Sequence, residues 1–113
     1  MSSDSLHAPR DRLQPHTVRT HQAIVSLMEE LDAVDWYQQR ADDCDDDALR
    51  DILLHNMREE IEHAAMLLEW LRRNHPAFDQ QLRRTLFTEA PITALEETPD
   101  APPAPRLSIG PMK

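Results

Sequence analysis

The chain has 113 residues, with one glycine, nine prolines, one cysteine and a formal net charge of −9. This length indicates one small domain, the single cysteine excludes an intrachain disulfide, and the acidic balance argues against nucleic acid, whose binding rewards Lys and Arg. No apolar run approaches the roughly 20 residues of a membrane span, so we expect no membrane association and, without a signal peptide, a cytoplasmic protein.

The first predicted helix follows a polar arm. Residues 1–14 show no apolar period and are predicted to form a flexible N-terminal arm, and Pro15 suits the first turn of a helix. From residue 16 to residue 40, apolar residues recur every three or four positions, which predicts an amphipathic helix. Glu30 interrupts the apolar stripe of this helix, at a position that should face the core.

An acidic turn is predicted at residues 42–47. Asp45 or Asp46 can accept the free amide hydrogens at the start of the next helix, whose positive end suits the negative charge. Calcium binding is the alternative, but the glycine and the terminal glutamate of an EF-hand are missing at their spacings. Cys44 has no Cys or His nearby in the sequence, and we assign it no role.

The second predicted helix runs from residue 46 to residue 74 and ends before Pro76. Glu60 and His63 stand three apart on its apolar stripe and are therefore neighbours on one face. A buried, unpaired carboxylate is costly, so a partner cation is expected, and di-iron bundles use Glu-x-x-His projecting inward from a helix. From spacing alone, a solvated glutamate beside a satisfied histidine is an equal alternative.

The second helix is apolar on more than one side. A further stripe indicates either self-association or a third helix packing there, since a two-helix hairpin covers only one stripe; it comprises Leu54, Met57, Ile61, Ala65 and Leu68. A shorter amphipathic helix is predicted at residues 76–87, followed by a last short turn.

The composition changes after residue 97, so we place one helical domain at residues 15–97. Residues 98–105 form a Pro-rich linker, which is extended and semi-rigid. Leu107 and Ile109 lie beyond it, with no core to join. Such a segment is usually a frayed terminus, but it can also be a short docking peptide.

The helices and the candidate ligands are each half of what a di-iron bundle needs. Such a centre takes a Glu from each of two helices and a Glu-x-x-His from each of the other two, whereas this chain offers Glu30 and the pair Glu60 and His63. A two-fold axis between identical hairpins supplies both missing halves. We therefore predict an all-α antiparallel two-helix hairpin, half of a ferritin-like four-helix bundle, with a short C-terminal helix, completed by dimerisation. Iron is favoured over zinc by an oxygen-rich donor set with two imidazoles.

The chain also resembles a known family. The matching segments are residues 28–37 (MEELDAVDWY), the pair His55 and Asn56, residues 59–66 (EEIEHAAM), residues 68–74 (LEWLRRN), residues 86–89 (LFTE), and Pro91 with Ile92. Together they resemble the encapsulated ferritins, the ferritin-like cargo of encapsulin nanocompartments, over about residues 16–97. The tail Leu107, Ser108, Ile109 and Gly110 is similar to the peptide that docks this cargo inside the shell, although Pro111 follows where the family usually has a small polar residue.

This resemblance implies a ferroxidase that oxidises Fe(II) to Fe(III) with dioxygen and supplies iron for mineral storage inside the shell. It implies two irons at each dimer interface, a ring of five dimers, and docking through Leu107, Ile109 and Gly110. By position, the resemblance makes Glu30, Glu60 and His63 the iron ligands and places Tyr37 beside the centre. It matches Glu29, Asp32 and Trp36 to a site where metal enters or binds secondarily; the family more often has Glu at the place of Asp32.

Several alternatives stand beside this hypothesis. A metal-free helical adaptor, recruited to a partner by its tail, would have the same soluble acidic faces. A di-metal peroxidase of the rubrerythrin kind would use similar ligands, although the chain lacks a Cys-x-x-Cys iron centre. The residues Glu29, Asp32 and Asp35 can equally form a solvated acidic face, and Tyr37 can be a core tyrosine, as well as a hydrogen-bonding neighbour of a ligand.

Overall fold

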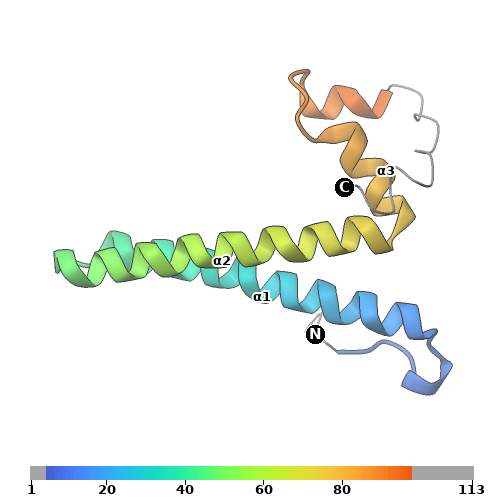
Figure 1. The fold of residues 1–113 in the computed structure, drawn as a ribbon, viewed down its shortest axis with the longest axis horizontal. Helices are drawn as coiled ribbons and strands as arrows, with labels where there is room; N and C mark the ends of the chain where they lie inside the picture. Colours follow the sequence, from blue (N-terminus) through green and yellow to red (C-terminus); the bar gives the residue numbers. More distant parts are fainter. Residues whose placement is uncertain (1–4, 98–113) are drawn as a thin grey trace. The chain divides into compact units, whose positions relative to one another are not determined.

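The computed structural model describes residues 5–97, and over this range every regular element is helical (Figure 1). The predicted all-α class is therefore confirmed. The chain divides into two compact units, Met1–Trp70 and Leu71–Lys113, which are described separately below. No helix of the described range is both long and apolar enough to cross a bilayer. The tail residues Leu107, Ile109 and Gly110 lie outside the described residues.

Two long helices form the first unit. A short 3-10 turn, η1 (Arg10–Arg12), precedes α1 (Pro15–Asp43), and α2 (Asp47–Asn74) follows after a short turn. Pro15 occupies the first turn of α1 as predicted, because its missing N–H would have no intrahelical partner there. The helix extends three residues beyond the predicted end at residue 40, and the added Ala41 is 1% exposed.

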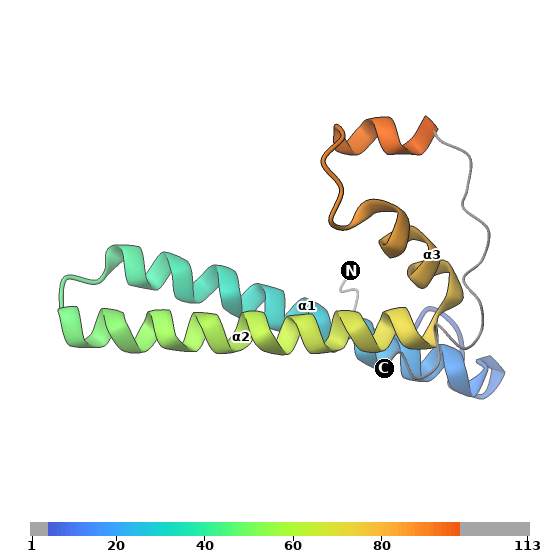
Figure 2. The same cartoon turned by 45° about the horizontal axis from the view of Figure 1, so that its top comes forward.

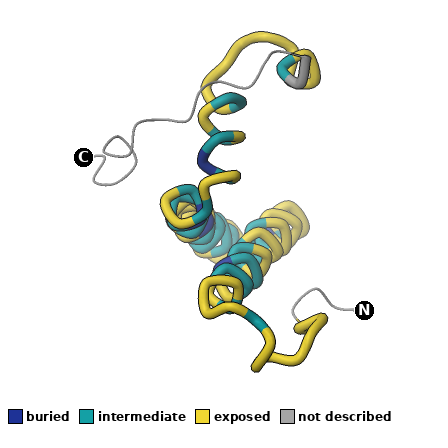
Figure 3. The backbone as a smooth tube through the Cα atoms, turned by 90° about the vertical axis from the view of Figure 1, so that its right-hand side faces the viewer, coloured by how far each residue is buried: buried dark blue, intermediate teal, exposed yellow. Residues whose placement is uncertain are grey.

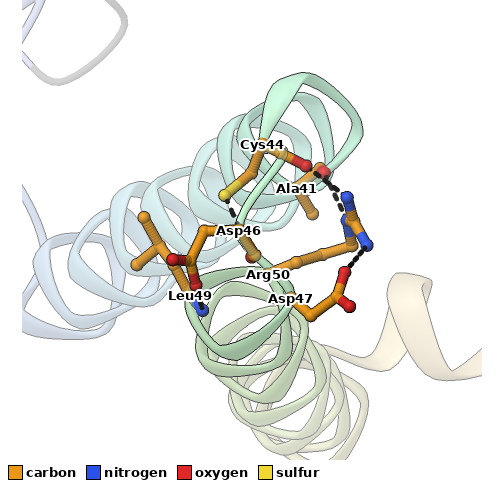
Figure 4. Close-up of polar contacts among 6 residues, drawn as sticks. All are labelled: Ala41, Cys44, Asp46, Asp47, Leu49 and Arg50. Carbon is orange, nitrogen blue, oxygen red and sulfur yellow. Dashed lines mark hydrogen bonds and ion pairs between the residues drawn. The ribbon is translucent and has the colours of Figure 1, made fainter.

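The turn between α1 and α2 is fixed by the side chain of Arg50 on α2 and by the cap residue Asp46 (Figure 4). Asp46 accepts the Leu49 amide hydrogen at 2.9 Å, so the predicted aspartate cap is confirmed. Arg50 donates to the carbonyl of Ala41 from Nε at 3.3 Å and to the carbonyl of Cys44 from Nη2. These carbonyls belong to the end of α1, where backbone acceptors have no helical partner. Arg50 thus joins the start of α2 to the end of α1.

The helices α1 and α2 run antiparallel and side by side in both ribbon views (Figures 1 and 2). Small residues allow this approach, since Ala23, Ala41 and Ala64 are buried. Most of the large apolar side chains of the hairpin remain half-buried or exposed (Figure 3). One chain therefore provides only a thin core, as expected when two helices have no further layer to cover them.

The second unit contains the helix α3 (Pro76–Thr85) and the 3-10 turn η2 (Ile92–Glu97). The helix α3 ends two residues before its predicted end, because Leu86 takes an extended backbone conformation (φ −73°, ψ 148°), and Phe87 after it has a left-handed φ of 60°. Asp79 on α3 is 4% exposed and pairs with Arg72 at the end of α2 and with Arg83 at 2.9 Å. This buried carboxylate joins the last turn of α2 to α3.

Replacing Asp79 with alanine should destabilise the chain by about 3 kcal/mol, because it removes the buried carboxylate that two arginines share. The free energy of unfolding is obtained from urea titration followed by circular dichroism. Asp51→Ala, which removes an exposed carboxylate of α2, is the matched control and should change that free energy by less than about 0.5 kcal/mol. Equal unfolding midpoints for the two variants would contradict a structural role for Asp79.

Candidate metal centre

Three candidate ligands meet on one side of the hairpin. Glu30 comes from α1, and Glu60 and His63 come from α2, where a spacing of three places them on one face. The Nδ1 atom of His63 lies 3.2 Å from Oε1 of Glu60 and 3.5 Å from Oε1 of Glu30. One ligand atom from each of the three residues lies within 4.8 Å of the others. Across the described residues, this is the one group of three or more such side chains.

The group is open to solvent on one side. The side chains of Glu30 and Glu60 are 26% and 25% exposed, and that of His63 is 46% exposed. Glu30 and Glu60 are thus half-buried at the helix contact, while the imidazole reaches the surface. Such an arrangement leaves room for additional ligands from outside the chain.

The two carboxyl groups influence each other directly. A hydrogen bond to Glu60 raises the pKa of Glu30, and partial burial raises it further. The same hydrogen bond lowers the pKa of Glu60, which is the accepting carboxylate. A hydrogen bond to Glu60 also raises the pKa of His63, since the two carboxylates favour the charged imidazolium. The protonation of each group therefore depends on the other two.

A divalent cation can replace those protons. Two carboxylates and one imidazole form an oxygen-rich set with one nitrogen, which suits iron and related hard or borderline ions. Binding requires both carboxylates ionised and the histidine neutral, so it releases protons. Three side chains satisfy only part of the coordination sphere of one ion, and they are too few for two ions.

Comparison with known proteins shows which family this chain belongs to. A family model described as EncFtn-like matches residues 5–89. An encapsulated ferritin-like protein of Rhodospirillum rubrum is 59% identical over 95 residues, which are 84% of this chain and 68% of that protein. The chain belongs to the encapsulated ferritin-like family. This membership assigns it a ferritin-like, iron-related role, and it confirms the family resemblance found in the sequence.

Two further relatives extend this result. A ferritin-like protein of Thermotoga maritima is 50% identical over 95 residues, covering 84% of this chain and 83% of that protein. A crystal structure of a protein from Nitrosomonas europaea is 53% identical, with a TM-score of 0.74, over 78% of this chain and 97% of that chain. The encapsulated ferritin-like fold thus covers the hairpin that carries Glu30, Glu60 and His63.

The other predicted site residues of this encapsulated ferritin-like chain lie on α1, outside the three-residue group. Tyr37 is half-buried, and the guanidinium carbon of Arg40 lies 5.5 Å from its ring centroid. Glu29 and Asp32 are exposed, and Trp36 is 52% exposed beside a shallow cavity of about 240 Å³ that Gln39 and Arg40 also line. The structure thus brings together Glu30, Glu60 and His63, while a metal-related role for the remaining four stays a prediction.

The sequence did not predict how closely Glu30 and Glu60 approach each other within one chain, with ligand oxygens within 4.8 Å. Each glutamate interrupts the apolar stripe of its helix, and in a hairpin the two stripes face each other. The spacing therefore did indicate that both glutamates lie on the faces that meet. The sequence could not give the register of the two helices, and so could not show whether the two glutamates lie opposite each other. That register depends on the turn that Asp46 and Arg50 fix.

Proposed function

We propose that the protein is a ferroxidase that oxidises Fe(II) to Fe(III) with dioxygen at a di-iron site shared between two copies of the chain. The observation that supports it best is the convergence of Glu30, Glu60 and His63 within 4.8 Å, in a chain of the encapsulated ferritin-like family. Two copies would bring four carboxylates and two imidazoles, the set that carboxylate-bridged di-iron bundles use. In this proposal, residues 15–97 form the ferritin-like domain.

Exposed apolar side chains around the group support its completion by a second copy. Leu31 is 54% exposed and directly follows Glu30, and Met66 is 62% exposed one turn after His63. Met28 and Ile52 are also exposed, on α1 and α2. A small hairpin that stays monomeric rarely exposes so many large apolar side chains to water. A two-fold partner would cover them and place its own three ligands opposite these three. A ring of five such dimers remains a proposal from the family resemblance.

The chemistry follows from the donor set. Each Fe(II) gives up one electron, so two adjacent irons supply the two electrons of a two-electron reduction of dioxygen. The carboxylates favour Fe(III) over Fe(II), because a higher positive charge gains more from nearby negative charge. Tyr37 would lie beside the centre in this proposal, where its phenol could hydrogen-bond to a ligand.

Crystals grown with Fe(II) and measured with anomalous scattering at the iron edge test this proposal, together with an oxidation assay on the same protein. We expect two iron peaks between the Glu60 and His63 side chains of two copies, and an Fe(III) absorbance that grows only in the presence of dioxygen. Oxidation at the uncatalysed rate, with no iron at Glu60, would leave the metal-free adaptor as the better assignment.

Neutralising Glu29 and Asp32 should alter the rate of iron oxidation while the iron content of the main group stays unchanged. Both side chains are exposed on α1 next to Glu30, where negative charge can attract Fe(II) and pass it on. Stopped-flow absorbance of Glu29→Gln with Asp32→Asn gives the rate. Glu62→Gln, an exposed residue of α2, controls for the loss of net charge. An unchanged rate would mean that Glu29 and Asp32 form an ordinary solvated face.

We also propose that the protein acts inside an encapsulin shell in the cytoplasm, docked by its C-terminal tail. The support is the name of the Rhodospirillum rubrum relative, which is encapsulated, and the tail residues Leu107, Ile109 and Gly110 beyond a Pro-rich linker.

Deleting residues 106–113 should abolish loading into the shell and leave the oxidation rate and the helical content unchanged. Co-expression with an encapsulin, followed by purification of intact shells, measures the loaded fraction. The double substitution Leu107→Ser with Ile109→Ser should reproduce the loss if these two side chains are the anchors. Full occupancy by the truncated protein would contradict docking through the tail.

A further inference from the structure

The second residue after α3, Phe87, carries two unfavourable features at once. Phe87 has a φ of 60°, a left-handed conformation that a bulky side chain rarely adopts and that glycine usually supplies after a helix. Its side chain is also fully exposed, at 102% of the reference area, although aromatic rings favour burial. Nothing within the described part of the chain covers the ring. Strain combined with full exposure indicates a function outside the folded chain itself.

A cavity lies close to Phe87 in the same compact unit. It has a volume of about 310 Å³ between α3 and η2, and its walls are Gln81, Arg84, Thr85, Ile92, Thr93 and Leu95. Arg84 donates to the carbonyl of Leu95 at 3.0 Å, which ties the two walls together. A cavity of about 150 Å³ is sufficient for benzene in a protein, so this one can hold a phenyl ring. Phe87 of the same chain does not line it.

We propose that the Phe87 ring of one copy inserts into the α3–η2 cavity of a second copy, and that the second copy returns the same contact. The ring and the cavity belong to one compact unit, so a two-fold axis lets each copy donate a ring and accept one. Leu86 and Ile92 flank the contact, are 43% and 73% exposed, and would be covered by it.

The area of this contact sets its role. One aromatic side chain buries about 150–250 Å², so two rings with their apolar neighbours fall below the roughly 1,200 Å² of a stable specific interface. The contact therefore does not hold a dimer alone. It acts as a second link between copies whose hairpins also expose Leu31, Ile52 and Met66. It needs no metal, and it is independent of the shared iron site.

Phe87→Gly tests the proposal, because it removes the ring and also relieves the left-handed strain. We expect a higher melting temperature for the chain and self-association about a hundredfold weaker, since the change removes both rings of the reciprocal contact. Sedimentation of the metal-free full chain gives the association constant, so a failure of the ferroxidase proposal would not affect the result. Leu6→Ala, at an exposed leucine of the other unit, should change neither quantity.

Filling the cavity is the complementary test. Thr93→Trp should weaken association in the wild-type background. It should have no further effect in the Phe87→Gly background, because both substitutions remove the same contact. A photo-reactive benzoylphenylalanine at position 87, in a mixture of isotope-labelled and unlabelled copies, should crosslink to residues 81–95 of the other copy. Association unaffected by Phe87→Gly, additive effects of the two variants, or crosslinks confined to one chain would each overturn the proposal.

Discussion

Replacing Glu60 with alanine is expected to abolish Fe(II) oxidation while the helical content of the chain stays unchanged. Glu60 lies beside both other members of the group, with Oε1 3.2 Å from Nδ1 of His63 and a carboxylate oxygen within 4.8 Å of one of Glu30. In a site shared by two copies, one substitution removes two of the six ligands. Loss of a residue that only orients a ligand costs about 10–100-fold, so we expect more than about a hundredfold for a ligand.

His63→Ala and Glu30→Ala should lower the oxidation rate to the same extent, because in the proposed site all three residues are ligands of one centre. Stopped-flow absorbance of Fe(III) formation gives the rate, and iron content by mass spectrometry shows whether the site is filled. Glu62→Ala is the matched control, since it removes an exposed carboxylate from the same turn of α2. Wild-type activity in Glu60→Ala would exclude this group as the reaction site and favour the adaptor.

Fe(II) is expected to drive assembly of the chain, and acid is expected to oppose that effect. Without metal, the facing carboxylates of two copies repel each other in a half-buried site, and divalent cations reverse this repulsion. Metal that binds the dimer and not the monomer shifts the equilibrium toward the dimer by mass action. At Fe(II) a hundred times above the dissociation constant, each bound ion should raise the dimerisation constant about a hundredfold, so two ions per dimer should raise it about ten-thousandfold.

The pH dependence follows from the directions of the pKa shifts. The pKa values of Glu30 and His63 are both raised, so each group holds its proton to a higher pH than it would in water. Both protons must leave before a cation binds, and lower pH therefore weakens Fe(II) binding. Fe(II)-induced association should begin to fall at a pH above the usual histidine range, because the pKa of His63 is raised, and it should recover when the pH is raised again.

Native mass spectrometry and light scattering under anaerobic conditions measure this linkage without oxidation. His63→Gln is the informative variant, because it removes the histidine proton and one ligand while keeping a polar side chain. It should require more Fe(II) for the same degree of assembly and show a weaker dependence on pH. An iron-loaded, active monomer would refute the shared site.

Much of the fold could be predicted from the sequence because its signals are local. The apolar period, Pro15, Pro76 and the aspartates before α2 determine where helices begin and end, and the observed boundaries differ from the predicted ones by at most three residues. The stripe positions of Glu30, Glu60 and His63 follow from the same period. Family motifs in α1 and α2 then connected these residues to iron, and the comparisons established the family.

The tertiary structure decided features that depend on residues far apart along the chain. The closeness of Glu30 to Glu60 depends on the register of the two helices, which Arg50 helps to set by bonding the carbonyls of Ala41 and Cys44. The burial of Asp79 between two arginines depends on the bend at His75, where the chain leaves α2 and enters α3. A helical period fixes which face a side chain occupies, but not which residue of a neighbouring helix stands opposite.

Phe87 shows the same limit most clearly. The apolar residues recur at helical spacing through Phe87, which predicted a helix to residue 87. In the structure α3 ends at Thr85, and the backbone of Phe87 lies in the left-handed region. Local propensity does not favour that conformation in a phenylalanine. It arises because the chain must reverse to bring η2 beside α3, where Arg84 bonds the carbonyl of Leu95. The sequence alone thus determined the helices and their chemistry, and tertiary contacts determined how these helices meet.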